Sequence, residues 1–197
     1  MFEPSDQAGT SVRVGELLSA PMYKRDEVLH AGSMVPAKPG VYSWWFKRLP
    51  SRFMDVSYCR SRDGMTLLYV GISPRRPSAS GAVSRQNLRR RLRTHYRGRA
   101  STSTLRLSLG VLLADELGIQ LALHGTKKHF GPGESVLSEW MGDNTRVSWL
   151  AVDEPWLVEE ALIRQMNVPL NLEGNSHNSF YRDLKQARAR AAASANS

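Results

Sequence analysis

The sequence predicts an α+β fold in which three short strands are combined with several helices. The stretches at residues 41–46, 67–70 and 145–152 are rich in β-branched and aromatic residues and are bounded by turn-forming residues, as strands are. Elsewhere, apolar residues recur at helical spacing. With 197 residues the chain can bury one substantial core, so we expect a single domain with extensions.

The N-terminal segment, residues 1–35, is predicted to be a helical extension. Residues 1–9 show no regular pattern and are expected to be disordered, whereas residues 12–18 and 23–30 are typical of short helices. The segment carries no catalytic motif, so we expect it to act as a scaffold or a subunit contact. A stretch rich in small residues and proline separates it from the first strand.

The first two strands are expected to form a β-hairpin with an inserted loop. In the first strand, odd-numbered residues from Val41 alternate with even-numbered residues from Tyr42, so the two sets point to opposite faces. The second strand, Leu67-Leu68-Tyr69-Val70, stops at Gly71 and is predicted to be buried. Asp63-Gly64 provides a turn between the two strands.

The helix predicted over residues 87–96 is the most informative element. Its positions Leu88, Arg91, Leu92 and His95 share one face because they are spaced i, i+3, i+4 and i+7. Arg91 therefore lies on the stripe that should face the protein, where an unpaired charge is costly. Two interpretations stay open for it: an internal ion pair, or a binding site for a substrate phosphate.

The second half of the chain is predicted to be mainly helical. A short strand is expected at residues 119–124, and the last of the three main strands follows at residues 145–152. The C-terminal segment, residues 176–197, should form a basic helix with a frayed tail. The predicted helices span residues 105–117, 134–141, 156–167 and 180–193.

Positive charge is concentrated in one part of the chain. The formal net charge is +9, while residues 64–114 alone sum to +10 because they contain ten arginines and neither an acid nor a lysine. A solvated basic face normally includes glutamates, so this run predicts a polyanionic partner, above all nucleic acid. The arginines expected to contact DNA are Arg75, Arg76, Arg85, Arg89, Arg90, Arg93, Arg97 and Arg106.

Composition excludes several other classes of protein. No apolar run approaches the ~18 residues of a membrane span, and the N-terminus does not resemble a signal peptide. The single cysteine, Cys59, excludes an intrachain disulfide and a multi-cysteine zinc site. A zinc site at His124 and His129 is disfavoured because no third ligand is evident. We therefore expect a cytoplasmic protein with no membrane partner.

One acidic residue occupies the same kind of position as Arg91. Glu159 shares a helical face with Leu162 and Ile163, so its carboxylate heads an apolar stripe. The helix macrodipole alone could favour an acid there, and pairing with Arg91 is a further possibility. A lone carboxylate also suits a single Mg²⁺ (or Mn²⁺), which keeps most of its waters.

These elements together resemble the GIY-YIG nuclease superfamily. Gly40-Val41-Tyr42 looks like its first motif and Tyr69-Val70-Gly71 like its second. Residues 88–92 are similar to the helix that bears the family's catalytic arginine, which falls at Arg91. Five elements in the right order, including the two described next, make the resemblance specific.

The remaining two elements follow the third strand. Glu159 matches the family's metal-binding glutamate, and Asn171 matches the asparagine that closes the site. The resemblance covers residues 36–175, which we predict to be the nuclease domain. It implies a small antiparallel three-stranded sheet flanked by helices, in agreement with the three predicted strands.

The resemblance also implies a reaction, the hydrolysis of a DNA phosphodiester with one Mg²⁺ (or Mn²⁺) per site. Tyr42 or Tyr69, helped by metal-bound water or by His95, would deprotonate the attacking water. The resemblance does not decide between the two tyrosines. Arg91 would bind the phosphate, and Glu159 would hold the metal on the leaving side.

Two departures from the family pattern favour its restriction-endonuclease branch over the excision-repair and homing members. The stretch between the two motifs is long, and His95 stands where many members carry tyrosine. We therefore expect double-stranded DNA as the partner, with a homodimer if the enzyme restricts DNA. Restriction in bacterial defence and DNA repair both stay open as roles. Two alternatives are a catalytically silent nucleic-acid-binding module and an RNase that uses the same site.

Overall fold

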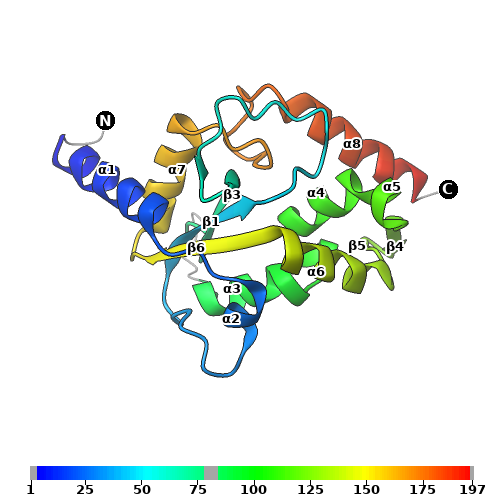
Figure 1. Ribbon diagram of the computed structural model, residues 1–197, viewed down its shortest axis with the longest axis horizontal. Helices are drawn as coiled ribbons and strands as arrows, with labels where there is room; N and C mark the ends of the chain where they lie inside the picture. Colours follow the sequence, from blue (N-terminus) through cyan, green and yellow to red (C-terminus); the bar gives the residue numbers. More distant parts are fainter. Residues whose placement is uncertain (1–3, 78–83, 196–197) are drawn as a thin grey trace.

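The centre of the computed structural model, which describes residues 4–77 and 84–195, is a four-stranded antiparallel sheet in the order β2-β3-β1-β6 (Figure 1). The predicted α+β class and the antiparallel sheet of three strands are confirmed, and a two-residue strand, β2, extends one edge. The strands span Gly40–Phe46 (β1), Ser61–Arg62 (β2), Met65–Ser73 (β3) and Thr145–Ala151 (β6).

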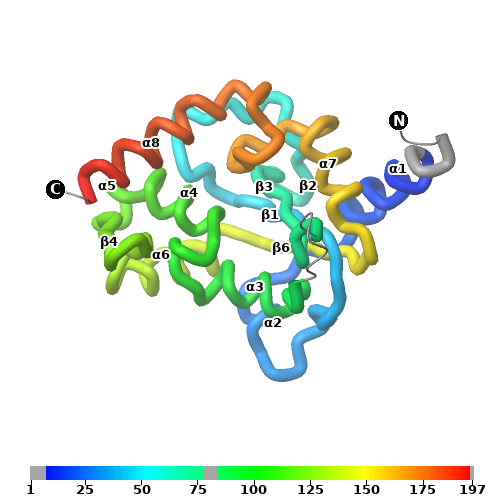
Figure 2. Tube along the Cα trace, turned by 180° about the vertical axis from the view of Figure 1, so that it is seen from behind, coloured from blue at the N-terminus to red at the C-terminus, as the bar shows by residue number. Residues whose placement is uncertain are grey.

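Helices pack on both faces of the sheet. Figures 1 and 2 show α1 and α7 at the end of the molecule near the N-terminus, and α4, α5 and α8 at the opposite end. Among the described residues, none of the helices is long and apolar enough to cross a bilayer. The helices span Pro4–Ser19 (α1), Arg25–Leu29 (α2), Leu88–Arg97 (α3), Thr104–Leu112 (α4), Ala114–Leu117 (α5), Gly133–Asn144 (α6), Pro155–Gln165 (α7) and Tyr181–Ser194 (α8).

The central strand β1 is buried along its whole length. It pairs with β3 on one side and β6 on the other, and helices cover both of its faces. Val41 and Trp45 belong to the apolar cluster that includes Leu162 of α7. Trp44 belongs to a second cluster, with Leu92 of α3. The alternation in the sequence therefore separates two layers of core, with α7 on one side of the sheet and α3 on the other.

The N-terminal helix is longer than its sequence suggested. α1 begins at Pro4, so residues 4–9, expected to be disordered, are helical, while residues 1–3 lie outside the described part of the chain. Val14 and Leu17 are buried in the same cluster as Leu162. Packing against α7 and the sheet stabilises this helix, and tertiary packing commonly outweighs weak helical propensity.

Other boundaries also differ from prediction. The helix expected over residues 105–117 is interrupted at Leu113, which separates α4 from α5. Lys127–His129 forms β5, which pairs with β4 (Ala122–His124) in a separate hairpin. α6 continues three residues beyond the predicted helix 134–141 and runs directly into β6 at Thr145.

Arg106, predicted to contact DNA, is buried instead. Its side chain is 0% exposed, and its Nη2 lies 2.6 Å from Oε2 of Glu134 on α6. The same guanidinium donates hydrogen bonds to the carbonyl oxygen of His95 (3.1 Å) and to Oγ of Ser138 (3.0 Å). Because its donors are used in the interior, none is left for a phosphate. The structure corrects the expectation: Arg106 joins α4 to α3 and α6.

We expect Arg106→Ala to lower the free energy of unfolding by about 3–5 kcal/mol, because it leaves the nearly buried Glu134 carboxylate without its counter-ion. Arg93→Ala removes an exposed arginine and should change this free energy by less than about 0.5 kcal/mol. Urea denaturation followed by circular dichroism measures both. Similar effects of the two substitutions would contradict the structural role of Arg106.

Candidate active site

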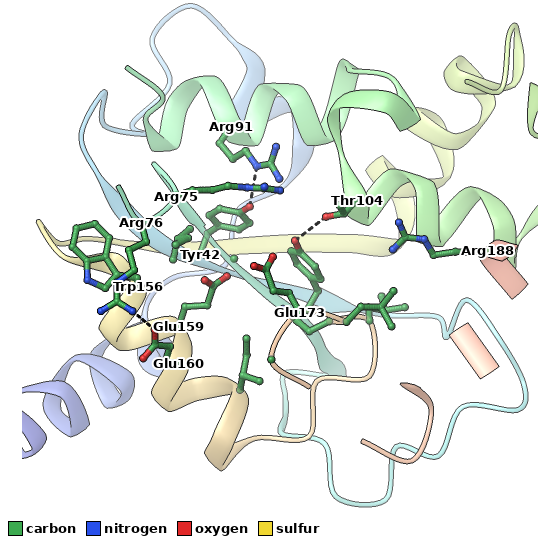
Figure 3. Close-up of a pocket in the computed structure, with 18 residues that line it drawn as sticks. Tyr42, Arg75, Arg76, Arg91, Thr104, Trp156, Glu159, Glu160, Glu173 and Arg188 are labelled. Carbon is green, nitrogen blue, oxygen red and sulfur yellow. Dashed lines mark hydrogen bonds and ion pairs between the residues drawn. The ribbon is translucent and has the colours of Figure 1, made fainter. Parts of the chain in front are cut away.

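A pocket of about 540 Å³ gathers residues from distant parts of the chain. Its walls come from β1, β3, α3, α4, α7, α8 and the segment that follows α7 (Figure 3). His95 is absent from these walls. The other five residues predicted to be catalytic line the pocket: Tyr42, Tyr69, Arg91, Glu159 and Asn171.

The two tyrosines lie on the same face of the β1–β3 hairpin. Tyr42 pairs with Gly71 and Tyr69 pairs with Trp44, so the phenol rings are diagonal neighbours with centroids 6.5 Å apart. A Cβ on Gly71 would lie 2.6 Å from Oη of Tyr42. A side chain at this position would displace the tyrosine, and this explains the glycine at the end of the second motif.

Two hydrogen bonds hold the Tyr42 hydroxyl. Nε of Arg91 donates to Oη over 3.2 Å, and Nε2 of His95 lies 2.7 Å from Oη. His95 is fully buried behind Tyr42, and its Nδ1 lies 2.7 Å from Oγ of Ser103. His95 therefore does not line the pocket and is linked to it through the Tyr42 hydroxyl.

Burial favours the uncharged forms of Tyr42 and His95, whereas Arg91 beside them is charged. Desolvation lowers the pKa of His95 well below its usual value, and the charges of Arg91 and Arg106 lower it further. Desolvation raises the pKa of Tyr42, as does neighbouring Tyr69, while Arg91 opposes the rise. In the tautomer with the proton on Nδ1, the neutral imidazole would donate a hydrogen bond to Ser103 and accept one from the Tyr42 hydroxyl at Nε2.

Arg91 lacks the acidic partner that an internal ion pair would require. Its Nη1 donates to the carbonyl oxygen of Thr102 over 3.0 Å and its Nε donates to Tyr42. No ion pair among the described residues includes it. Desolvation lowers its pKa, but the two neighbouring tyrosines raise it by more, so the guanidinium stays charged. Of the two interpretations, the geometry favours an anion site.

Glu159 extends from α7 toward Tyr42 in the pocket (Figure 3). Within residues 4–77 and 84–195, its carboxylate takes part in no hydrogen bond or ion pair. Burial raises its pKa to about 7, the nearby charges of Glu173 and Glu160 raise it too, and two arginines oppose them. Glu160 differs, because its carboxylate lies 3.2 Å from Nη1 of Arg76 in an exposed ion pair.

These surroundings fit a divalent cation. A carboxylate without donors, next to other carboxylates, is stabilised by a bound cation, and Mg²⁺ needs few protein ligands. Across the described residues, no group of three His, Cys, Asp or Glu side chains is placed to hold a metal ion. An ion at Glu159 would therefore take most of its ligands from water and substrate.

Asn171 lines the pocket, but its side-chain amide belongs to the fold. Its Oδ1 accepts from the Val70 N–H and its Nδ2 donates to the Val70 carbonyl oxygen, both over 2.9 Å. The neighbouring Leu170 N–H donates to the carbonyl oxygen of Leu68 over 3.0 Å. The segment after α7 is thus held against β3, and Asn171 fixes the strand that carries Tyr69.

The arginines predicted to contact DNA are not all at the pocket. Arg75 and Arg76 line it, and Arg106 is in the interior. Arg89 is half-buried and donates from Nε to the carbonyl oxygen of Val35 over 2.7 Å. The others are exposed and lie outside the pocket: Arg85, Arg90, Arg93 and Arg97.

The charged or polar residues Thr104, Glu173 and Arg188 line the pocket without having been predicted from the sequence. Oγ1 of Thr104 lies 3.4 Å from Oη of Tyr69, and Arg188 comes from α8, which we assigned to the C-terminal extension. Helical spacing could have indicated Arg188, because it lies one turn after the buried Leu184. Nothing in the local sequence marks Thr104 or Glu173.

Comparison with models of known protein families gives a match to the GIY-YIG catalytic domain over residues 40–190. The matched range contains all four strands of the main sheet and every residue that lines the pocket. Neither the curated proteins nor the solved structures contain a match to this chain.

Glu159 should make the stability of the protein depend on pH. The folded protein keeps a proton on Glu159 up to about pH 7, whereas the unfolded chain loses it near 4.5, so stability falls as the pH rises between these values. Glu159→Gln cannot ionise, so it should raise the Tm relative to the parent above pH 7 and leave it unchanged below about pH 4.

Thermal unfolding at both pH values measures this effect. Glu160→Gln is the matched control and should give no such increase, because it removes an exposed ion pair with Arg76. A Tm of Glu159→Gln below that of the parent at neutral pH would mean that the carboxylate has a stabilising partner.

Proposed function

Because the chain belongs to the GIY-YIG family of catalytic domains, we propose that it is a divalent-metal-dependent endonuclease that hydrolyses DNA phosphodiester bonds. The family is one of nucleases, so the substrate is nucleic acid. One observation carries the proposal: side chains from four separate elements meet in a single pocket, namely Tyr42, Tyr69, Arg91 and Glu159.

In this proposal Arg91 binds the scissile phosphate. Its guanidinium is charged, half-buried and without a carboxylate partner among the described residues, and a phosphate would supply the missing anion. Its donors would also offset the charge that develops on the phosphate oxygens as water attacks. The bond from Nε to Tyr42 holds the phosphate-binding group beside the hydroxyl.

We assign the general base to Tyr42 rather than Tyr69. The Tyr42 hydroxyl lies 2.7 Å from Nε2 of His95, which can accept its proton, whereas the Tyr69 hydroxyl lies 3.4 Å from the Thr104 hydroxyl and interacts with Arg91. Tyr42 would accept the proton of the attacking water while its own proton moves to His95. Tyr42 then avoids a full negative charge, which its burial disfavours, and the charge on His95 is transient because burial and the neighbouring arginines lower the pKa of His95.

Glu159 would hold the metal ion, one per site. When bound, Mg²⁺ (or Mn²⁺) would neutralise charge on the scissile phosphate and the leaving oxygen. The cation would also compensate the charge of Glu159 and its acidic neighbours, which otherwise favours protonation of that carboxylate. Metal binding and ionisation of Glu159 are therefore coupled.

The test of this function is digestion of supercoiled plasmid DNA with Mg²⁺ or with EDTA. The parent protein should cleave only with the metal, and Glu159→Gln should lose cleavage by at least about a hundredfold while it still binds DNA. Glu160→Gln should retain cleavage, because its carboxylate is directed to Arg76. Equal losses in the two variants would argue against Glu159 as the ligand.

Assays with both RNA and DNA distinguish this function from the two alternatives, an RNase and a catalytically silent binding module. Cleavage of RNA but not DNA would point to an RNase with the same site. Binding of nucleic acid with no cleavage of either substrate would point to a catalytically silent binding module.

The number of strands cut reports on the oligomeric state. Each chain carries one Tyr42, one Arg91 and one Glu159, hence one site for one phosphodiester. The scissile phosphates of a duplex lie on strands of opposite polarity, so we expect a monomer to nick and a two-fold homodimer to break both strands. A restriction-like role in bacterial defence requires the second behaviour.

Plasmid digestion and sedimentation at the same protein concentrations measure both properties. Nicked circles should accumulate under conditions where the protein is monomeric, and linear DNA should form without them where it is dimeric. Direct linearisation by a monomer would refute the argument from one site.

A further inference from the structure

Helix α8 forms one wall of the pocket and is anchored by apolar side chains. Leu184 is fully buried, and Ala191 and Ala195 pack against the same core. The positions 184, 188, 191 and 195 share one helical face. Arg188 therefore interrupts an otherwise apolar inward stripe, as Arg91 does on α3.

Arg188 has no counter-ion of its own. Its side chain is half-buried and lines the pocket, yet within the described residues its guanidinium enters no hydrogen bond or ion pair. Burial lowers its pKa, and neighbouring Tyr69 opposes that shift. A charge withdrawn from water without a partner costs free energy. The neighbouring Arg182 and Arg190 do not carry this cost, because both are exposed.

The position of Arg188 extends the row of arginines across the pocket. Figure 3 shows Arg188 and Thr104 on one side of the pocket and Arg76 on the other, with Glu159 and the guanidinium of Arg75 between them. Arginines therefore lie on both sides of the Glu159 carboxylate, and one of them, Arg76, forms an exposed ion pair with Glu160. Phosphates recur regularly along a nucleic-acid strand, so a strand laid across this pocket would meet cations on both sides of its scissile phosphate.

We propose that Arg188 binds a backbone phosphate next to the scissile one, so that the substrate strand runs across the pocket from α8 toward Arg75 and Arg76. The guanidinium fork suits a phosphate, and the phosphate supplies the anion that Arg188 lacks. This assignment rests on the proposed nuclease function and adds a strand path to it. It also makes α8 a substrate-binding wall of the pocket.

The experiment measures binding of a labelled DNA duplex by the full chain in EDTA, at several salt concentrations. Arg188→Gln should weaken binding about tenfold at low salt, because one charge-assisted contact is lost. The slope of log affinity against log salt concentration should fall by about 0.9, the value for one phosphate. The matched control is Arg190→Gln, which removes an exposed arginine of the same helix and should change the affinity by less than about twofold.

Two further measurements separate binding from packing. Because Arg188 has no hydrogen-bond or ion-pair partner among the described residues, Arg188→Gln should unfold at no lower temperature than the parent, and earlier unfolding would overturn the proposal. Arg188→Lys keeps the charge but not the fork, so it should lower the affinity with the salt slope unchanged. Parent-like affinity of Arg188→Lys would overturn the proposal even if Arg188→Gln failed to fold.

Plasmid cleavage by the same preparations distinguishes failure of the proposed strand path from failure of the proposed nuclease function. If Arg188→Gln binds DNA as Arg190→Gln does while the parent still cleaves, the strand path is wrong and the nuclease function stands. If the parent neither binds nor cleaves DNA, both are wrong.

Discussion

The Tyr42 ring packs directly on the backbone of Gly71, and the geometry of the site depends on this contact. With the ring in this position, the hydroxyl lies within hydrogen-bonding distance of Arg91 on one helix and of His95 behind it. The hairpin that creates the contact is buried on both faces, so the strands cannot slide without disrupting two layers of core. The Tyr42 hydroxyl is thereby held rigidly at the edge of a charged pocket.

Three charged residues with similar sequence contexts show how a protein uses buried charge. Arg106 has a carboxylate at 2.6 Å and a full set of acceptors, and it joins helices. Arg91 and Glu159 lack such partners among the described residues and face a pocket. Because unpaired buried charge is costly, a position that retains it indicates a ligand-binding site, while a paired position indicates a structural role. Arg188 belongs with Arg91 and Glu159.

Much of the fold and part of the site follow from local patterns. The alternation around Tyr42 and the helical spacing of Arg91 and Glu159 are properties of short segments, so the sequence predicts which way these side chains point. The same reasoning failed for Arg106, because its partner Glu134 lies 28 residues away and no local pattern connects them. It also failed for α1, whose stability comes from packing on α7 and the sheet rather than from its own residues.

By itself, the sequence determined the α+β class, the three main strands, the order of the motifs and the inward faces that carry Arg91 and Glu159. Only the tertiary structure decided that His95 lies behind Tyr42, that the Asn171 amide is bound to Val70, and that α8 brings Arg188 to the pocket. The physical reason is the distance along the chain over which each kind of interaction acts. Side-chain direction is set by backbone periodicity over a few residues, whereas partners and burial are set by contacts between segments far apart in the chain.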